Sequence, residues 1–309
     1  MVLQIHELFI IIVSPKVKTL KLKFKLMQKV FFIVHLLLVS LVGRAQEKSP
    51  YQLFDKNGKK VTYKKLLKSA ENTEVLLFGE HHDNSIVHWL QLEVTKDLAK
   101  RKQVILGAEM LEADNQKQVN QYLAGEINQK QLDSTARLWS NYKTDYKPLV
   151  DFAKDKKLTF IATNIPRRYA SMVFKNDFQA LDSLTEEEKL WIAPLPIPFD
   201  ITLPGYKAMM EMMEHAGEKM PKAQAIKDAT MAYFIYKNLI KDGVFIHYNG
   251  TYHSDNFEGI SWYLKKVNSA IKIVTIATVE QEDISKLEKE NFSKADFILV
   301  IDTDVTKTY

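Results

Sequence analysis

Two histidines stand three residues after a glycine, each directly beyond a short apolar run, and they are the side chains best placed for chemistry. Gly79 leads to His82 in Gly79-Glu80-His81-His82, and Gly250 leads to His253 in Gly250-Thr251-Tyr252-His253. Glycine lets the chain turn sharply where it leaves a strand. The histidine that follows can then point back over the end of the strand. We expect His82 and His253 to meet at one edge of a parallel sheet.

Acids and an amide follow the same kind of run. Glu80 stands in the first turn, Glu109 follows a second run and Asn164 follows a third. In open parallel sheets, ligands bind outside the carboxyl ends of the strands. Imidazole and carboxylate suit a divalent transition metal, so His82, His253, Glu80 and Glu109 are candidate metal ligands. The same groups could act as acid and base around a water, with Glu80 and Glu109 catalytic. Taken singly, His82 could merely cap a helix and Glu109 could be a solvated acid.

Strands and helices alternate along most of the chain. Apolar runs bounded by turn residues are typical of strands buried on both faces. Helical spacing separates several of them, as in residues 86–98 and 260–267. This alternation predicts an α/β fold with a mainly parallel sheet flanked by helices. The six predicted strands are 74–78, 104–106, 158–162, 244–248, 271–276 and 297–301.

Two long stretches do not fit the alternation. Residues 111–147 and 171–239 have helical character and contain no strand run. We expect them to form a helical cap inserted into a single α/β domain that spans residues 46–309. Within the second stretch, Met209, Met210, Met212 and Met213 precede His215. Methionine at helical spacing usually packs a core, but here it could also form an apolar wall over a flat ligand.

The first 45 residues resemble an export signal. A basic residue, Lys29, precedes the apolar run 30–42, and Gly43-Arg44-Ala45 offers a cleavage site. We expect Met27 to be the true start and Gln46 the mature N-terminus of a periplasmic or secreted protein. The alternative is that the segment is kept as an anchor, although the run is short for a bilayer span.

Charge and cysteine content exclude several classes of protein. The net charge is +5, but residues 1–45 carry +6, which leaves −1 for the rest. A near-neutral body argues against nucleic-acid binding, which needs a basic face. The chain has no cysteine, which rules out disulfides, thiolate ligands and the lipid attachment of a bacterial lipoprotein.

The motifs resemble those of a known family. Gly79-Glu80-His81-His82-Asp83-Asn84, followed by His88 and Gln91, is similar to the opening signature of the ChaN-like haem-binding family in the Tiki superfamily. Further elements resemble that family in the expected order. They are Glu109 in 107–110, the Asn-x-Pro-Arg element 164–167, the helix around 227–232 and the second Gly-x-x-His at 250–253.

The resemblance implies a parallel α/β core, a helical insertion and haem as the cofactor. It implies a tyrosine phenolate as the axial ligand, which would favour ferric haem. Tyr206 is the preferred candidate, with Tyr169 and Tyr252 as alternatives. Arginines can pair with haem propionates through two hydrogen bonds. The remaining residues assigned to the cofactor on this basis are Arg167, Arg168, His215, Met209, Met213, His88 and Asn164.

Two functions follow from these observations. The resemblance favours an exported haem-binding protein in haem or iron uptake, with a homodimer and an outer-membrane uptake machinery as expected partners. The residues alone favour a metal-dependent hydrolase, in which a bound metal lowers the pKa of water. A binding module with a vestigial site is a third interpretation.

Overall fold

The computed structural model describes residues 23–32, 48–212 and 214–309. The chain divides into residues 1–49 and a compact unit of residues 50–309. In the first unit, residues 23–32 are helical. The rest of the predicted signal, including residues 33–45 and Gln46, lies outside the described residues. Among the helices that the structure describes, none combines the length and apolar character needed to cross a bilayer.

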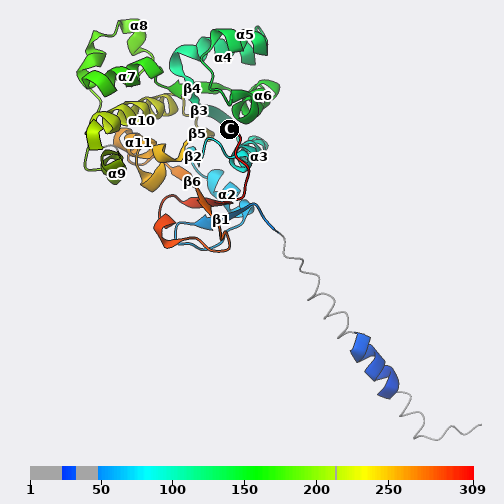
Figure 1. The fold of residues 1–309 in the computed structure, drawn as a ribbon. Helices are drawn as coiled ribbons and strands as arrows, with labels where there is room; N and C mark the ends of the chain where they lie inside the picture. The colour runs from blue at the N-terminus through cyan, green and yellow to red at the C-terminus, as the bar shows by residue number, and fades with distance from the viewer. Residues whose placement is uncertain (1–22, 33–47, 213) are drawn as a thin grey trace, which may run out of the picture. The chain divides into compact units, whose positions relative to one another are not determined.

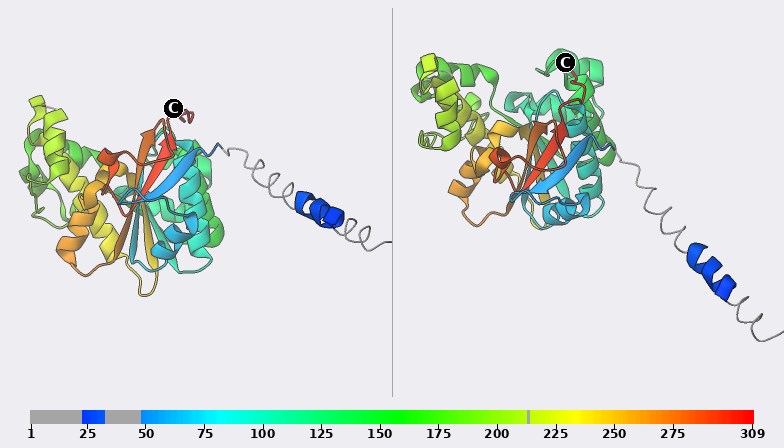
Figure 2. Two further views of the ribbon diagram at one scale, coloured as in Figure 1. Left: turned by 90° about the horizontal axis from the view of Figure 1, so that it is seen from below. Right: turned by 60° about the horizontal axis from the view of Figure 1, so that its bottom comes forward.

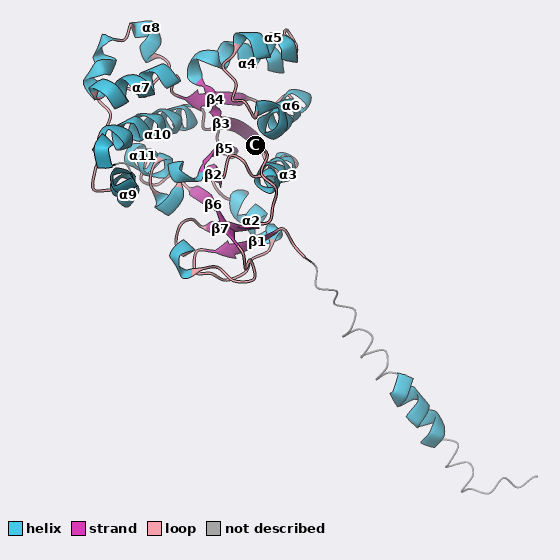
Figure 3. Cartoon of the chain, viewed as in Figure 1, coloured by secondary structure: helices cyan, strands magenta, loops and turns pink. Residues whose placement is uncertain are grey.

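A seven-stranded sheet forms the centre of the unit 50–309 (Figures 1 and 3). The strand order is β1-β7-β6-β2-β5-β3-β4. All neighbouring pairs are parallel except β1 with β7. The strands are β1 (Tyr51–Asp55), β2 (Val75–Glu80), β3 (Val104–Glu112), β4 (Phe160–Asn164), β5 (Val244–Gly250), β6 (Ile273–Gln281) and β7 (Phe297–Asp302).

Helices cover both faces of this sheet. In Figure 1, α7, α10 and α11 lie to the left of the row of strands, and α2, α3 and α6 lie to the right; Figure 2 shows the same layers from other sides. The helices are α2 (Tyr63–Ala70), α3 (Ser85–Ala99), α4 (Gln116–Leu123), α5 (Gln129–Thr135), α6 (Lys147–Lys156), α7 (Arg167–Asn176), α8 (Glu186–Lys189), α9 (Pro204–Met212), α10 (Lys219–Lys237) and α11 (Ile260–Val267). This arrangement confirms the predicted fold class.

The alternation of side chains along the strands builds one core on each face. On β2, Leu76 and Phe78 pack with α2, α3 and α6, whereas Val75 and Leu77 pack with α7, α10 and α11. All four side chains are fully buried. Because successive residues of a strand face opposite sides, a strand between two helical layers is apolar throughout. Such a strand holds its carboxyl end rigidly.

The six predicted strands are present, and the structure adds a seventh, β1. This strand pairs antiparallel with β7 at the edge of the sheet. Its sequence Tyr-Gln-Leu-Phe-Asp buries only Leu53 and Phe54. A short edge strand with polar residues carries little of the apolar pattern that reveals a central strand.

The two stretches expected to be insertions contain mostly helix. The first begins inside β3, which continues to Glu112, and then includes α4, α5 and the one-turn π-helix η2 (Tyr142–Tyr146). The second includes most of α7 and all of α8, α9 and α10. Helix α10 packs directly against α7, α11 and β4. Both stretches belong to the same compact unit as the sheet.

Candidate functional site at the carboxyl edge of the sheet

The two Gly-x-x-His turns lie side by side because β2 and β5 are paired in parallel. Gly79 lies opposite Asn249, and Glu80 lies opposite Gly250. A Cβ atom on Gly79 would stand 2.8 Å from the carbonyl oxygen of Ile276, so only glycine fits there without a shift. A Cβ on Gly250 would stand 2.7 Å from Nε2 of His82. Both glycines therefore allow a close approach at this edge.

Glu80 organises the first half of the site. Its Oε1 lies 2.7 Å from Nδ1 of His82 and accepts a hydrogen bond of 2.7 Å from the Tyr146 hydroxyl. Its Oε2 accepts a bond of 2.6 Å from Nε2 of Gln91. Glu80 is 1% exposed, so these donors replace the water that a buried carboxylate requires. In the neutral imidazole, this contact places the proton of His82 on Nδ1 and leaves Nε2 towards Gly250.

The turn that carries His82 is also held through its backbone. The carbonyl oxygen of His82 lies 3.0 Å from Nε2 of His88 and accepts a bond of 3.1 Å from Nδ2 of Asn141. Asn141 also donates to Asp145, a residue of the π-helix η2. Single π-turns are frequent at functional sites, and this one delivers both Asp145 and Tyr146 to the edge of the sheet.

A buried acid–histidine–acid group forms the second half. His253 lies between Glu109 and Asp228, with Nε2 at 3.2 Å from Glu109 Oε1 and Nδ1 at 2.5 Å from Asp228 Oδ1. Glu109 also accepts the backbone N–H of Gly250 at 2.7 Å, and Gln224 contacts His253 Nδ1 at 2.8 Å. The three charged residues are at most 5% exposed. An imidazolium between two carboxylates compensates charges that burial would otherwise make costly.

Electrostatics link the two halves. Burial by itself lowers the pKa of His253, but Glu109 and Asp228 outweigh it and raise the pKa to about 9. Burial also opposes protonation of His82, yet its hydrogen bond to Glu80 and the charge of Glu109 raise its pKa. For Glu109 the effect of burial is overcome by His253 and His82, which lower its pKa. Glu109 thus acts on both imidazoles.

The structure places Tyr206 beside this group. It is 3% exposed, its ring stacks on Phe199, and its hydroxyl donates to Asp228 at 3.2 Å. Burial and the charge of Asp228 raise the pKa of Tyr206. The phenol is therefore protonated in this arrangement, and a phenolate ligand would require Tyr206 to leave Asp228.

The other residues assigned to a cofactor are spread over a wider area. Asn164 is buried beside Glu109, and its Nδ2 donates to the carbonyl oxygen of Glu109 at 2.9 Å. The Oδ1 of Asn164 has no hydrogen-bond partner among the described residues. Met209 is half-buried in α9, and His215 is exposed. Met213 lies outside the described residues.

Arg167 and Arg168, which were expected to bind the propionates, are exposed at the start of α7. Arg168 donates to Asp114 at 2.6 Å and lies over the rings of Tyr169 and Trp191. Arg168 therefore contacts Asp114, Tyr169 and Trp191, and none of these belongs to the group around His82 and His253. Of the alternative tyrosines, Tyr169 is buried and donates to Glu188, whereas Tyr252 is 69% exposed next to His253.

The predicted metal site is not supported. In the described part of the chain, no group of three or more His, Asp or Glu side chains is arranged to hold a metal ion. The physical reason is that the expected ligands are already paired. Nδ1 of His82 is taken by Glu80, and both ring nitrogens of His253 face carboxylates.

Sequence reasoning missed several members of the site. Asp228 and Gln224 come from α10, and Tyr146 comes from η2. Asp228 has a detectable signal, because an acid within the mainly apolar stretch Ala225–Ala232 is out of place unless it is paired. Tyr146 has none, since nothing in its neighbours distinguishes it from a core tyrosine.

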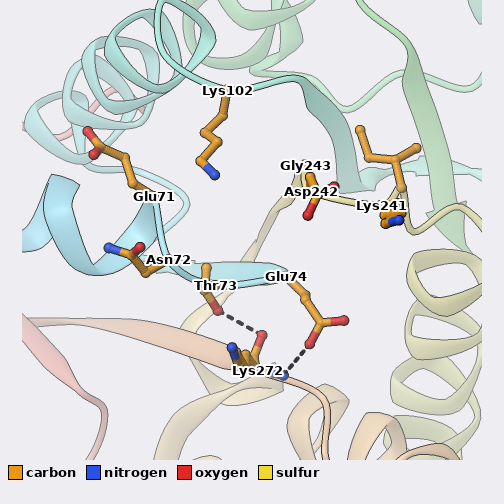
Figure 4. Close-up of a pocket in the computed structure, with 10 residues that line it drawn as sticks. Glu71, Asn72, Thr73, Glu74, Lys102, Lys241, Asp242, Gly243 and Lys272 are labelled. Atoms are coloured by element: carbon orange, nitrogen blue, oxygen red, sulfur yellow. Dashed lines mark hydrogen bonds between the residues drawn. The ribbon is translucent and has the colours of Figure 1, made fainter.

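A pocket of about 480 Å³ lies at the opposite edge of the sheet. Its lining residues immediately precede β2, β3, β5 and β6, so it is formed at the amino ends of the strands (Figure 4). Three lysines and three acids line it together with uncharged residues: Lys102, Lys241, Lys272, Glu71, Glu74 and Asp242. None of the motif residues contributes to this pocket.

One solved structure shares this fold, and two others match it less well. A structure of ChaN of Campylobacter jejuni, described as showing cofacial haem binding, matches with a TM-score of 0.63 at 17% identity, over 83% of this chain and 98% of that chain. The erythromycin esterase EreC matches with a TM-score of 0.48 at 10% identity, over 83% and 100%. A protein from Bacillus cereus matches with a TM-score of 0.47 at 12% identity, over 77% and 90%.

The family assignment rests on the sequence match. Among curated proteins, no match is found. The family described as "Haem-binding uptake, Tiki superfamily, ChaN" matches residues 66–264, which is more than half of the chain and includes both Gly-x-x-His turns. The chain therefore belongs to the ChaN haem-binding uptake family of the Tiki superfamily.

Proposed function

We propose that this protein binds haem at the carboxyl edge of the sheet and serves haem or iron uptake. The observation that carries the proposal is the family match over residues 66–264, which contains the whole edge site built on β2, β3 and β5. The fold shared with the haem-binding ChaN of Campylobacter jejuni agrees with it.

The residues at this edge fit the chemical groups of haem. Haem has two carboxylates and a broad apolar face. His82 has a raised pKa and a side chain that is 32% exposed, so its imidazole suits contact with a propionate. The unpartnered Oδ1 of buried Asn164 can accept one further hydrogen bond from a ligand or a water. Exposed Tyr252, in the one-turn helix η5 (Thr251–His253), and exposed Met212, in α9, offer apolar surface.

The axial ligand is a second part of the proposal. A tyrosine ligand favours ferric iron, since it is a hard anionic donor. Tyr206 can serve only if its hydroxyl leaves Asp228, loses its proton and binds the iron, because Asp228 now accepts its hydrogen bond. Tyr252, which is exposed beside His253, needs no such exchange. Replacing each tyrosine by phenylalanine and recording the charge-transfer bands of the ferric complex distinguishes the two.

A hemin titration of the purified protein tests the function. We expect a shifted Soret band that saturates near one haem per chain, and a red-brown colour in protein purified from haem-replete cells. Lys102→Ala, at the amino edge, is the matched control and should bind as the parent does. A spectrum identical to that of free hemin at micromolar protein contradicts the proposal.

Export and assembly belong to the same proposal. We infer that residues 1–45 are a signal, that the mature protein starts at Gln46 without a lipid anchor, and that it works as a homodimer with an outer-membrane uptake system. N-terminal sequencing of exported protein tests the first inference, and a start upstream of Val30 contradicts it. Sedimentation with and without hemin tests the dimer, for which a haem-loaded monomer is the contrary result.

A further inference from the structure

The segment after β7 returns to the turn that carries His82. Residues Thr303–Tyr309, here called the C-terminal strap, begin with a turn in which Val305 N–H donates to Asp302. Lys307 then forms an isolated antiparallel bridge with Asn84, and Thr308 N–H donates to the carbonyl oxygen of Asp83 at 2.8 Å. In Figure 1 the end of the chain lies beside α3, the helix that Asn84 caps.

Side chains of the strap reinforce this backbone contact. Nζ of Lys307 lies 3.4 Å from Asp83 Oδ1 and also donates to Glu280, a residue of β6. Asn84 donates to the same Glu280 oxygen at 3.2 Å. The strap therefore ties the two residues that follow His82 to the neighbouring strand.

A second connection runs from Thr308 to His82 itself. The hydroxyl of Thr308 donates to Asp145 Oδ2 at 2.9 Å, and that same oxygen accepts Nδ2 of Asn141 at 2.7 Å. Asn141 in turn donates to the carbonyl oxygen of His82. Asp145 is 3% exposed, and a buried carboxylate depends on such donors. The Thr308 hydroxyl is one of the two hydrogen-bond donors that this carboxylate has in the described structure.

We propose that the C-terminal strap positions the His82 turn through Thr308 and Lys307, and that it thereby tunes ligand binding at the carboxyl edge. Thr308 and Lys307 are positioning residues, since they act on His82 through Asp83, Asn84 and Asp145. The effect on the turn stands by itself, whereas the effect on ligand affinity rests on the proposed haem binding.

The first test uses the protein without ligand. Thr308→Val keeps the shape of the side chain and removes the donor to Asp145. We expect the amides of residues 84–88 to exchange with deuterium about tenfold faster, which matches the loss of one hydrogen bond to a charged group. Thr308→Ser should restore the parent rate. Thr306→Val, an exposed neighbour on the same strap, is the matched control and should not change it.

The second test measures function. Thr308→Val should weaken hemin binding several-fold and shift the pH at which the His82 imidazole titrates by NMR, and Thr308→Ser should restore both. If Thr308→Val does not fold, Lys307→Met, at an exposed position, carries the same measurements. Unchanged exchange and an unchanged His82 titration overturn the proposal, as does an equal effect of Thr306→Val. If the parent protein binds no hemin, the proposed function is contradicted. The deuterium exchange of residues 84–88 then still decides whether the strap positions the His82 turn.

Discussion

The two edges of one sheet carry ionisable residues in opposite ways. At the carboxyl edge, Glu80, Glu109, Asp228 and His253 are at most 5% exposed and are paired with one another or with buried donors. At the amino edge, three lysines and three acids surround an open pocket of about 480 Å³ (Figure 4). Four of these charged residues are exposed, and Glu71 and Lys102 are half-buried. The shifted pKa values of the buried residues Glu109, Asp228 and His253 indicate a functional site at the carboxyl edge, whereas mostly exposed charges around a pocket do not. In this protein, buried charged residues therefore locate the functional site better than the pocket does.

Of the changes considered, removal of His253 should lower the free energy of unfolding most, compared with a change at the amino edge. His253→Ala leaves Glu109 and Asp228 buried without their shared cation, which costs about 3–5 kcal/mol for a broken buried pair. Urea unfolding at pH 7 measures the loss. Lys241→Ala at the amino edge is the comparison. A loss for His253→Ala no greater than that of Lys241→Ala would mean that the acid–histidine–acid group is not formed.

The pH dependence of stability should reveal the environment of His253. Its pKa is raised from 6.5 to about 9, so the stabilisation is fully present below about pH 6.5 and is lost as pH rises through 9. The loss in free energy of unfolding that His253→Gln causes should therefore be about 3 kcal/mol smaller at pH 9.5 than at pH 6.5. Urea unfolding of the parent and the variant at both pH values measures it.

His247 provides the opposite case. It is fully buried between Thr163 and Asn249, and burial lowers its pKa from 6.5 to about 4. Its contribution is present above pH 6.5 and is lost as pH falls towards 4. The loss in free energy of unfolding that His247→Gln causes should therefore become smaller as the pH falls from 6.5 towards 4. Equal pH dependence of the two variants would contradict the assignment of His253 as a charged residue.

Loss of the Tyr146 hydroxyl should have an intermediate effect. Tyr146→Phe removes one of the hydrogen bonds to the Glu80 carboxylate, which is worth about 1.5–3 kcal/mol when the acceptor is charged. Thermal unfolding checks the loss, and Tyr236→Phe, at an exposed tyrosine, is the matched control. A change no larger than that of the control would show that Glu80 does not depend on Tyr146.

The smallest effect is expected for the amino-edge lysines. Lys102→Ala removes a side chain with no ion pair among the described residues, so the free energy of unfolding should change by less than about 0.5 kcal/mol. Urea unfolding of Lys102→Ala beside Lys272→Ala checks this. A large loss in either would show that the amino edge also depends on its charges.

The fold was predictable from sequence wherever a strand is buried on both faces. The apolar runs of β2 to β7 stand out because no position of such a strand can be polar without a partner. The edge strand β1 was missed because it buries only Leu53 and Phe54.

The site was predictable only in part, for a related reason. His82, Glu109 and His253 follow strand runs directly, and the parallel order of strands brings such ends together. Asp228 and Tyr146 arrive from α10 and η2, whose placement depends on long-range packing that no local pattern encodes. The same packing puts Tyr206 in contact with Asp228, a contact that its sequence neighbours do not suggest.

The most direct test of haem binding at the carboxyl edge is a hemin titration of the parent protein together with His82→Ala and Lys102→Ala. The account predicts a shifted Soret band with one haem per chain in the parent and in Lys102→Ala, and an affinity at least about tenfold weaker in His82→Ala, as expected for the loss of a charged hydrogen bond. Equal affinity in all three proteins, or no shift in any of them, would contradict it.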